Sequence, residues 1–351
     1  MINSICVVRL SALGDVLMLV PLIRTLQTHF PKAAITWIIS RPAYDLVEGM
    51  DGVEFIVINK PDSLKDYWQF KKQLKGRSFD VLLAAQASFR ANLLYPLIRA
   101  SRKIGYDLYR AKDGHKWFIH EAISAANGHT LEGFLQFATA LGVTQHELRW
   151  NLPITQEDFT WAREHLPSNG PVLLVNPAAS KRERSWPVER YIAVIKEAQQ
   201  RWQAQVVLTG GPGNLDRELA DEILKKVQCV DLVGNTRPKQ LLALISEADV
   251  LLCPDTGPSH MAAAVGTPVI ALHAVTNSQV SGPYTFRHLA VDCYPEAVKN
   301  ILKKGNAEDA WGEKVHGIEA MKLIQIEAVL AKLEQVILPL VPNPIDNFAN
   351  N

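Results

Sequence analysis

Residues 253–268 read CPDTGPSHMAAAVGTP, and this stretch decides the class of the fold. The apolar residues 248–253 predict a buried strand, and the small residues 262–264 predict a short helix after the turn. A strand that turns through glycine into a helix points backbone N–H groups and the positive end of the helix dipole at one place. The stretch therefore predicts a site for a phosphate group.

Individual side chains of this turn fit the same interpretation. Gly257 would allow a close approach with a positive φ, and the Thr256 and Ser259 hydroxyls would add donors. His260 is either a donor to the anion or a packed residue of the helix cap. The alternative for the whole stretch is a plain turn in which Asp255 or Ser259 caps the helix.

Apolar runs alternate with helical patterns on both sides of this stretch. Strands are predicted at residues 4–10, 34–39, 54–58, 81–85, 172–175, 205–208 and 230–232, with helical or turn segments between them. This alternation indicates parallel sheets with helices on both faces, an α/β fold. The polar residues 150–170 predict a linker. We therefore expect domains at 1–160 and 168–317, followed by a long helix within 318–345.

Composition restricts the possible partners and the compartment. The 351 residues carry a formal net charge of +1, so no field over the whole protein would attract nucleic acid. No apolar run reaches the length needed to span a membrane, and a strand begins too early for a signal peptide. The four cysteines are scattered without paired spacing, which is typical of a reducing compartment: Cys6, Cys229, Cys253 and Cys293. We expect a cytoplasmic protein.

Residues 11–15, which read SALGD, follow the first predicted strand. Open α/β sheets bind ligands at the carboxyl ends of their strands, so Asp15 is a candidate general base, although it could instead cap the next helix. The loop lacks both G-x-G-x-x-G and the Walker lysine, which argues against a dinucleotide site and a P-loop. The sequence contains no Asp-x-Asp motif and no His/Cys/carboxylate cluster, so we expect no metal and no other cofactor.

Two further loops of the second domain carry polar residues at strand ends. Lys181, Arg182 and Arg184 follow the strand at 172–175 and predict an anion site. The glycine-rich residues 210–213 follow the next strand, with Asp216 close behind. Asp216 would accept from ribose hydroxyls or would only complement a helix N-terminus, and the sequence leaves both alternatives open.

Residues 99–116 of the first domain are rich in positive charge. This segment is either a solvated surface or a local wall that binds anions or faces a membrane. It combines six cations with three aromatic side chains: Arg99, Arg102, Lys103, Arg110, Lys112 and Lys116, with Tyr106, Tyr109 and Trp117 among or beside them.

Three of these motifs together resemble glycosyltransferase family 9, the ADP-heptose:lipopolysaccharide heptosyltransferases. They are RLSALGDV at 9–16 with Pro21, RSWP at 184–187 and, most specifically, DTGPSH at 255–260. Their order and separation match over nearly the whole chain. The resemblance implies a GT-B architecture, in which two Rossmann-like domains face each other across a cleft and the C-terminal helix crosses back onto the first domain.

The resemblance also implies a reaction, the inverting and metal-independent transfer of heptose from ADP-heptose to the Kdo/inner-core region of lipopolysaccharide. Asp15 would be the catalytic base. Donor binding would fall to Arg184, Asp216, Asp255, Thr256, Gly257, Pro258, Ser259 and His260. The acceptor, of the Kdo-lipid A type, would meet Ser11, Gly14, Gln86, Arg90 and Lys112. Arg184 departs from the lysine that the family usually has before Trp-Pro, which keeps the charge but changes its geometry.

The resemblance further implies a monomer that works in the cytoplasm, peripherally on the cytoplasmic face of the inner membrane, without nucleic acid. Two other functions remain open. One is a GT-B enzyme that uses another nucleotide-sugar donor or acceptor, such as a different transferase or an epimerase. The other is a non-enzymatic nucleotide-binding module, in which Asp15 would have no effect on turnover.

Overall fold

The computed structural model describes residues 1–125, 128–305, 310 and 312–340. The chain divides into two compact units, Met1–Pro153 and Ile154–Asn351, and each is described by itself. Among the described residues, no helix combines the length and the apolar character that crossing a bilayer requires.

The first unit is built on a parallel sheet in the order β3-β2-β1-β4-β5-β6. Its strands are β1 (Ser4–Val8), β2 (Ala34–Ser40), β3 (Val53–Ile58), β4 (Phe79–Leu83), β5 (Ala100–Gly105) and β6 (Glu121–Ala122). Ile5 of β1 pairs with Ile35 on one side and with Val81 on the other. The strand order therefore reverses between β1 and β4, which is the place where such sheets bind ligands.

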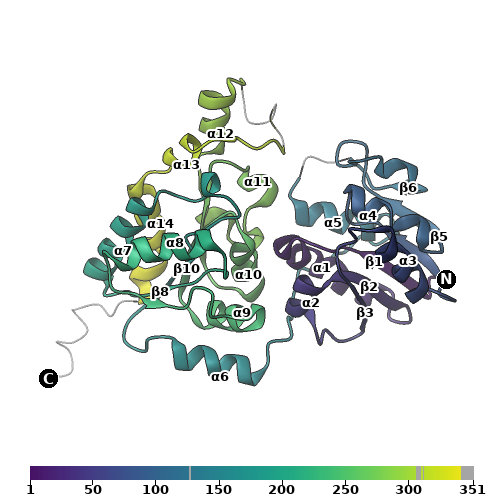
Figure 1. Ribbon diagram of the computed structural model, residues 1–351, viewed down its shortest axis with the longest axis horizontal. Coiled ribbons are helices and arrows are strands. Elements are labelled where there is room, and N and C mark those ends of the chain that lie inside the picture. The colour runs from purple at the N-terminus through teal and green to yellow at the C-terminus, as the bar shows by residue number, and fades with distance from the viewer. Residues whose placement is uncertain (126–127, 306–309, 311, 341–351) are drawn as a thin grey trace. The chain divides into compact units, whose positions relative to one another are not determined.

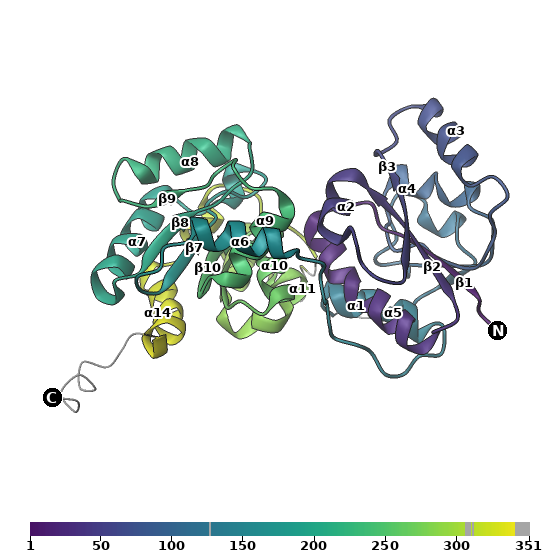
Figure 2. The same ribbon diagram turned by 90° about the horizontal axis from the view of Figure 1, so that it is seen from below.

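Helices cover this sheet because their apolar faces need a partner. They are α1 (Leu13–His29), α2 (Arg41–Val47), α3 (Leu64–Gln73), α4 (Phe89–Asn92) and α5 (Thr130–Thr139), with the short 3-10 turns η1 (Tyr95–Leu97) and η2 (His115–Trp117). α1 lies beside α5 (Figure 2) and is buried along most of its length. α3 begins with a capping box, in which Ser63 N–H donates to the Asp66 carboxylate at 2.9 Å.

The second unit repeats the same strand order, β12-β11-β10-β7-β8-β9. The strands are β7 (Val172–Val175), β8 (Gln205–Leu208), β9 (Val230–Asp231), β10 (Val250–Pro254), β11 (Val269–His273) and β12 (Val291–Asp292). Every pairing is parallel, and the order reverses between β7 and β10. The prediction of two parallel α/β sheets is confirmed.

Several helices of the second unit share one apolar core, and the others pack outside it. The helices of this unit are α6 (Gln156–His165), α7 (Val188–Trp202), α8 (Asn214–Leu224), α9 (Pro238–Glu247), α10 (Gly257–Val265), α11 (Ser278–Ser281), α12 (Tyr294–Ala297), α13 (Glu319–Lys322) and α14 (Ile326–Ile337), with the short turns η3 (Arg182–Arg184), η4 (Tyr284–Leu289), η5 (Val298–Leu302) and η7 (Leu338–Leu340). α6 packs on α9, so the division after Pro153 falls earlier than the expected boundary at 160–168.

The C-terminal helix packs on the core of the second unit, and its crossing back onto the first domain stays a prediction. α14 packs on α7 and on β10, β11 and β12 of the second unit (Figure 1). Leu333 and Ile337 are fully buried in that unit's core, which explains the choice of partner. The expected long helix is also interrupted, because Gln325 before α14 has an extended backbone. Residues 341–345 of that expectation lie outside the described residues.

Candidate active site

The second unit places Arg184 and Asp255 together at the point where its strand order reverses. Val175 of β7 pairs with Leu252 of β10, so the loops after these two strands are neighbours. Arg184 Nη2 donates to the Asp255 carbonyl at 3.0 Å and lies 3.2 Å from the Asp255 carboxylate. The exposed Arg182 instead pairs with Glu218 at 2.6 Å. Of these two arginines, Arg184 is the one directed toward the end of β10.

Asp255 is a largely buried carboxylate, with a side chain 13% exposed, that holds Arg184 in place. Its Oδ2 also accepts from the Thr276 hydroxyl at 2.7 Å and from the Ser281 hydroxyl at 3.4 Å. Burial alone would raise the pKa of Asp255. His273, His260, the Thr276 hydroxyl and Arg184 act in the opposite direction and together leave the pKa below its ordinary value. Asp255 therefore stays ionised and fixes the direction of the guanidinium.

The turn into α10 carries donors that the protein leaves unused. Thr256 occupies the N-cap position, and no side chain caps the helix. The alternative of Asp255 or Ser259 as the cap is therefore not realised. Among the described residues, nothing accepts a hydrogen bond from Gly257 N–H. A helix N-terminus with a bare N–H group attracts an anion.

Two buried polar atoms near Asp255 lack hydrogen-bond partners within the described part of the chain, Thr256 Oγ1 and His273 Nε2. The Cys253 thiol is close to the first: burial raises the pKa of this thiol, and the Thr256 hydroxyl acts in the opposite direction. A thiol is a weak partner, so the hydroxyl keeps most of its capacity. Buried polar atoms are nearly always paired, and this pair of exceptions fits a site that a polar ligand completes.

Two details of the turn differ from the expectation. The Ser259 hydroxyl is buried and donates to the Thr256 carbonyl at 2.7 Å, so it is not available as a donor to a ligand. Gly257 is the first residue of α10 and has no positive φ; the residue with a left-handed backbone is Gly266, with φ 86°, where α10 ends. Pro258 lies in the first turn of α10, where its missing N–H costs nothing. His260 is buried.

Asp216 organises the glycine-rich loop after β8. It lies in the first turn of α8, and its Oδ1 accepts from Gly211 N–H at 2.8 Å. A Cβ atom on Gly213 would lie 2.9 Å from Asp216 Oδ2, so the loop wraps closely around the carboxylate. This arrangement agrees with the alternative in which Asp216 complements the N-terminus of a helix, here α8. A contact of Asp216 with ribose stays a prediction.

The first unit places Asp15 where its own strand order reverses. Asp15 lies in the first turn of α1, accepts from Ala12 N–H at 3.1 Å and forms an ion pair with Arg9 at the end of β1. Its side chain is 29% exposed, so a substrate hydroxyl can still reach it. Asp15 therefore combines the capping contact with a position that suits a base.

Arg9 was not among the predicted site residues, although it opens the first motif. Its Nη1 donates to the Ala85 carbonyl at 2.9 Å, and its guanidinium lies 5.3 Å from the centre of the Phe134 ring. Burial acts to lower the pKa of Arg9, but the Asp15 carboxylate more than compensates and the pKa rises. The sequence did contain a signal for Arg9, namely an arginine at the end of an apolar strand. A cation at such a position is buried and needs an anionic partner.

The predicted acceptor residues gather at the same edge of the first sheet. Ser11 and Gly14 belong to the loop and first turn around Asp15. Gln86 follows β4, and its Oε1 accepts from Leu10 N–H at 2.7 Å across the reversal of strand order. Arg90 on α4 pairs with Asp62 at 2.8 Å. Lys112 is exposed, and its backbone carbonyl accepts from the Asn92 side chain of α4 at 3.0 Å.

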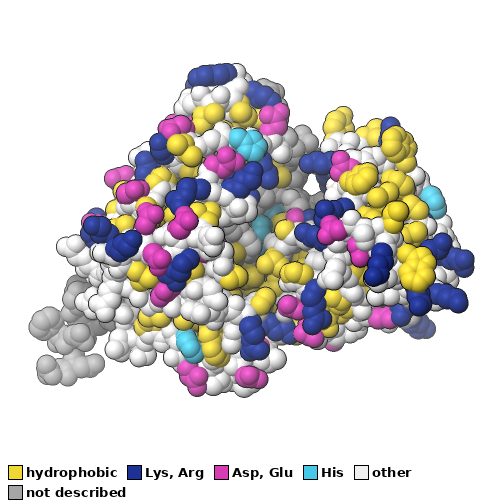
Figure 3. Space-filling view, viewed as in Figure 1, with side chains coloured by type: hydrophobic (Ala, Val, Ile, Leu, Met, Phe, Trp, Pro, Cys, Tyr) yellow, Lys and Arg dark blue, Asp and Glu magenta, His cyan; other side chains and the backbone are white. Residues whose placement is uncertain are grey.

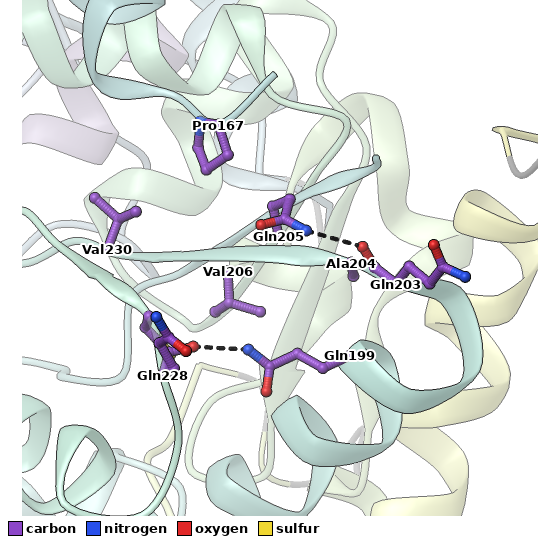
Figure 4. A pocket seen from close by; sticks show the side chains of 9 residues that line it. Pro167, Gln199, Gln203, Ala204, Gln205, Val206, Gln228 and Val230 are labelled. Carbon is purple, nitrogen blue, oxygen red and sulfur yellow. Dashed lines mark hydrogen bonds between the residues drawn. The ribbon is translucent and has the colours of Figure 1, made fainter. Parts of the chain in front are cut away.

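A pocket of about 500 Å³ lies elsewhere, at the amino ends of β8 and β9 (Figure 4). Two of the glutamine side chains in its lining already donate to backbone carbonyls: Gln199 donates to the Gln228 carbonyl at 2.7 Å, and Gln205 to the Gln203 carbonyl at 3.3 Å. The candidate site residues all lie at the carboxyl ends of strands, so this pocket is not part of the candidate site.

Comparison with known proteins then identifies the family. The profile of the family described as Glycosyltransferase family 9 (heptosyltransferase) matches residues 67–311. The chain belongs to this family. A relative, the lipopolysaccharide core heptosyltransferase OpsX of Haemophilus influenzae, is 33% identical over 95% of this chain and 97% of its own length. Membership of family 9 makes the protein a glycosyltransferase.

Solved structures of family 9 proteins share the fold. A glycosyl transferase family 9 protein of Veillonella parvula has a TM-score of 0.78 at 20% identity and covers 96% of this chain and 97% of its own. The Escherichia coli heptosyltransferase WaaC with ADP has a TM-score of 0.70 at 20% identity, over 95% of this chain and 99% of its own. The α/β fold that the resemblance implied is thereby confirmed.

Proposed function

We propose that this family 9 enzyme transfers heptose from ADP-heptose to the Kdo/inner-core region of lipopolysaccharide. The observation that carries this proposal is the turn into α10. Among the described residues, the Thr256 hydroxyl and the Gly257 N–H have no hydrogen-bond partner there, and the Arg184 guanidinium is fixed on the neighbouring Asp255. The names of the relatives supply the sugar and the acceptor: OpsX is a lipopolysaccharide core heptosyltransferase, and WaaC has been solved with ADP.

The donor side is a set of groups that suits a diphosphate. Helix N-terminal N–H groups and the Thr256 hydroxyl would donate to its oxygens, while Arg184 would balance the charge that grows on the leaving ADP. Asp255 would act indirectly, because its Oδ2 is already occupied by Arg184 and Thr276. Asp216 would accept from the ribose beside the glycine-rich loop that it organises.

On the acceptor side, Asp15 would take the proton from the attacking hydroxyl, and the anomeric configuration of the heptose would invert. Arg9 would hold the Asp15 carboxylate in the right orientation through their ion pair. Gln86, Arg90 and Lys112 would contact the carboxylates and phosphates of a Kdo-lipid A acceptor. The protein would act as a monomer in the cytoplasm, at the cytoplasmic face of the inner membrane.

Alanine at Thr256 should weaken ADP binding by about tenfold to a hundredfold, because a hydrogen bond to a charged group contributes roughly 1.5–3 kcal/mol. Calorimetric titration with ADP measures this effect. Thr267→Ala is the matched control, since that buried hydroxyl donates to the Ile245 carbonyl at 2.6 Å, away from the turn. Unchanged ADP affinity in a folded Thr256→Ala protein would place the diphosphate elsewhere.

Chelation should leave turnover unchanged. Within the described residues, no group of three or more His, Cys, Asp or Glu side chains is arranged to hold a metal ion. We therefore propose that helix N–H groups and Arg184 stabilise the leaving diphosphate without a metal. The measurement is heptosyl transfer after exhaustive EDTA treatment, with and without added Mg²⁺ or Mn²⁺. A strict need for the added ion contradicts the metal-free mechanism.

The identity of the donor separates this function from its rivals. With a Kdo-lipid A acceptor present, ADP-heptose should be consumed at least about a hundredfold faster than UDP-glucose, matched in concentration. Equal use of both donors would favour a transferase of broader specificity. ADP binding without any turnover of ADP-heptose would favour a nucleotide-binding module.

A further inference from the structure

The first unit exposes an unusual set of aromatic side chains. Among the described residues, all four large aromatic side chains that are exposed belong to it: Trp68 at 62%, Phe89 at 64%, Tyr109 at 88% and Trp117 at 78%. Leu64 and Leu108 are exposed beside them in sequence. We call these six residues the aromatic surface. Leaving so much apolar area in water costs hydrophobic free energy, so a cluster of this kind marks a place of interaction.

Hydrogen bonds join the three segments that carry the aromatic surface. The Tyr67 hydroxyl of α3 donates to the Arg90 carbonyl of α4 at 3.2 Å. Phe89 N–H donates to the Asp113 carboxylate at 2.9 Å, which joins α4 to the loop after β5. The three segments are therefore neighbours in the fold. Figure 3 shows yellow apolar side chains and dark blue cations intermingled over the first unit.

The loop after β5 is held firmly, so its aromatic side chains are not exposed by disorder. The buried His115 ring lies between Asn92, 2.8 Å from its Nδ1, and Tyr106 N–H, which donates to its Nε2 at 3.1 Å. Nε2 accepts, so the proton of the neutral ring sits on Nδ1. Burial lowers the pKa of His115 to about 4, and the ring stays neutral at physiological pH.

Positive charge surrounds the aromatic surface. Residues 60–75, 89–92 and 106–117 contain nine Lys or Arg and four Asp. The acids are engaged locally: Asp62 pairs with Arg90, Asp66 caps α3, Asp107 pairs with Arg110, and Asp113 accepts from Phe89. Lys72 lies over the Trp68 ring at 5.5 Å, while Lys65, Lys112 and Lys116 are exposed. This excess of cations would repel a second copy of the same surface and attract an anionic partner.

We propose that the aromatic surface docks the enzyme onto an anionic lipid bilayer. Tryptophan and tyrosine prefer the level of the lipid headgroups, and lysine and arginine beside them pair with lipid phosphates. Phe89 follows β4 and Leu108 follows β5, so the surface begins at the sheet edge that carries Asp15 and Gln86. The inference rests on the proposed function, because an acceptor anchored in a membrane has to be met at that membrane.

Flotation of the full chain with lipid vesicles tests this inference without donor or acceptor. Vesicles that contain phosphatidylglycerol should bind at least about tenfold more protein than pure phosphatidylcholine vesicles, and salt should weaken the binding. Trp68→Ser/Trp117→Ser should lower binding to the anionic vesicles at least about tenfold. The matched control, Ile318→Ser/Leu338→Ser, removes two exposed apolar side chains of the second unit and should bind as the natural protein does.

Equal binding to both kinds of vesicle, or full binding by the tryptophan variant, would overturn the inference. So would self-association that the tryptophan substitutions abolish, because the surface would then be an interface between copies. Activity supplies a second measurement. The tryptophan variant should lose transfer to acceptor in vesicles but keep transfer to a soluble core oligosaccharide. If the proposed function fails, no acceptor gains heptose, yet the binding to vesicles remains.

Discussion

Replacing Asp15 with asparagine should lower single-turnover heptosyl transfer by about 10²–10⁴-fold and leave ADP affinity nearly unchanged. Asparagine has a similar shape and can still accept from Ala12 N–H, but it cannot take up a proton from the attacking hydroxyl. Arg9 would lose its ionic partner, so melting curves should be recorded in parallel. ADP binding should be preserved because the donor residues belong to the second unit.

Asp66→Asn provides the matched control for this experiment. Asp66 occupies the same position in the first turn of α3 that Asp15 occupies in α1, and it also accepts from a backbone N–H three residues earlier. A substitution that acts only through helix capping should have similar small effects at both positions. Near-full turnover by Asp15→Asn, equal to that of the control, would reduce Asp15 to a helix cap.

Arg184→Met should lower kcat/KM by about 10²–10³-fold, the usual cost of removing one preorganised group that stabilises developing charge. A second effect adds to this loss, because the largely buried Asp255 carboxylate would lose its charged partner. Arg184→Lys should retain more activity than Arg184→Met, since the charge remains while the forked geometry is lost.

Arg182→Met is the control for Arg184, because Arg182 lies in the same turn but is exposed and pairs with Glu218. Steady-state kinetics with ADP-heptose and calorimetric titration with ADP should be compared for the three variants. If Arg184→Met and Arg182→Met behave alike, Arg184 does not meet the diphosphate, and its contact with Asp255 is structural.

The sequence could predict the two sheets because each strand is a short apolar run and each turn carries glycine, proline or polar residues. The same pattern located Asp15, Arg184 and the turn into α10 at strand ends. It could not predict where α14 packs, because an amphipathic pattern shows that a helix has an apolar face but not which core receives it. The position of α6 on α9 was missed for the same reason.

Details within the turn into α10 also lay beyond the sequence. Thr256 and Ser259 are both hydroxyl residues, but the fold turns Ser259 back onto the Thr256 carbonyl and leaves Thr256 Oγ1 without a partner. Gly257 was expected to need a positive φ, whereas it begins α10 and Gly266 ends it. Such choices depend on atomic positions inside one helical turn, which periodicity does not encode.

The most direct test of the proposed function is the mass of the acceptor after incubation with ADP-heptose. Kdo-lipid A and the same acceptor already bearing one heptose should be offered separately, each with the natural protein and with Asp15→Asn. The account predicts that one of the two acceptors gains the mass of a single heptosyl residue with the natural protein, and that the variant forms far less product. If neither acceptor gains mass while ADP-heptose stays intact or is merely hydrolysed, the protein is not the heptosyltransferase proposed.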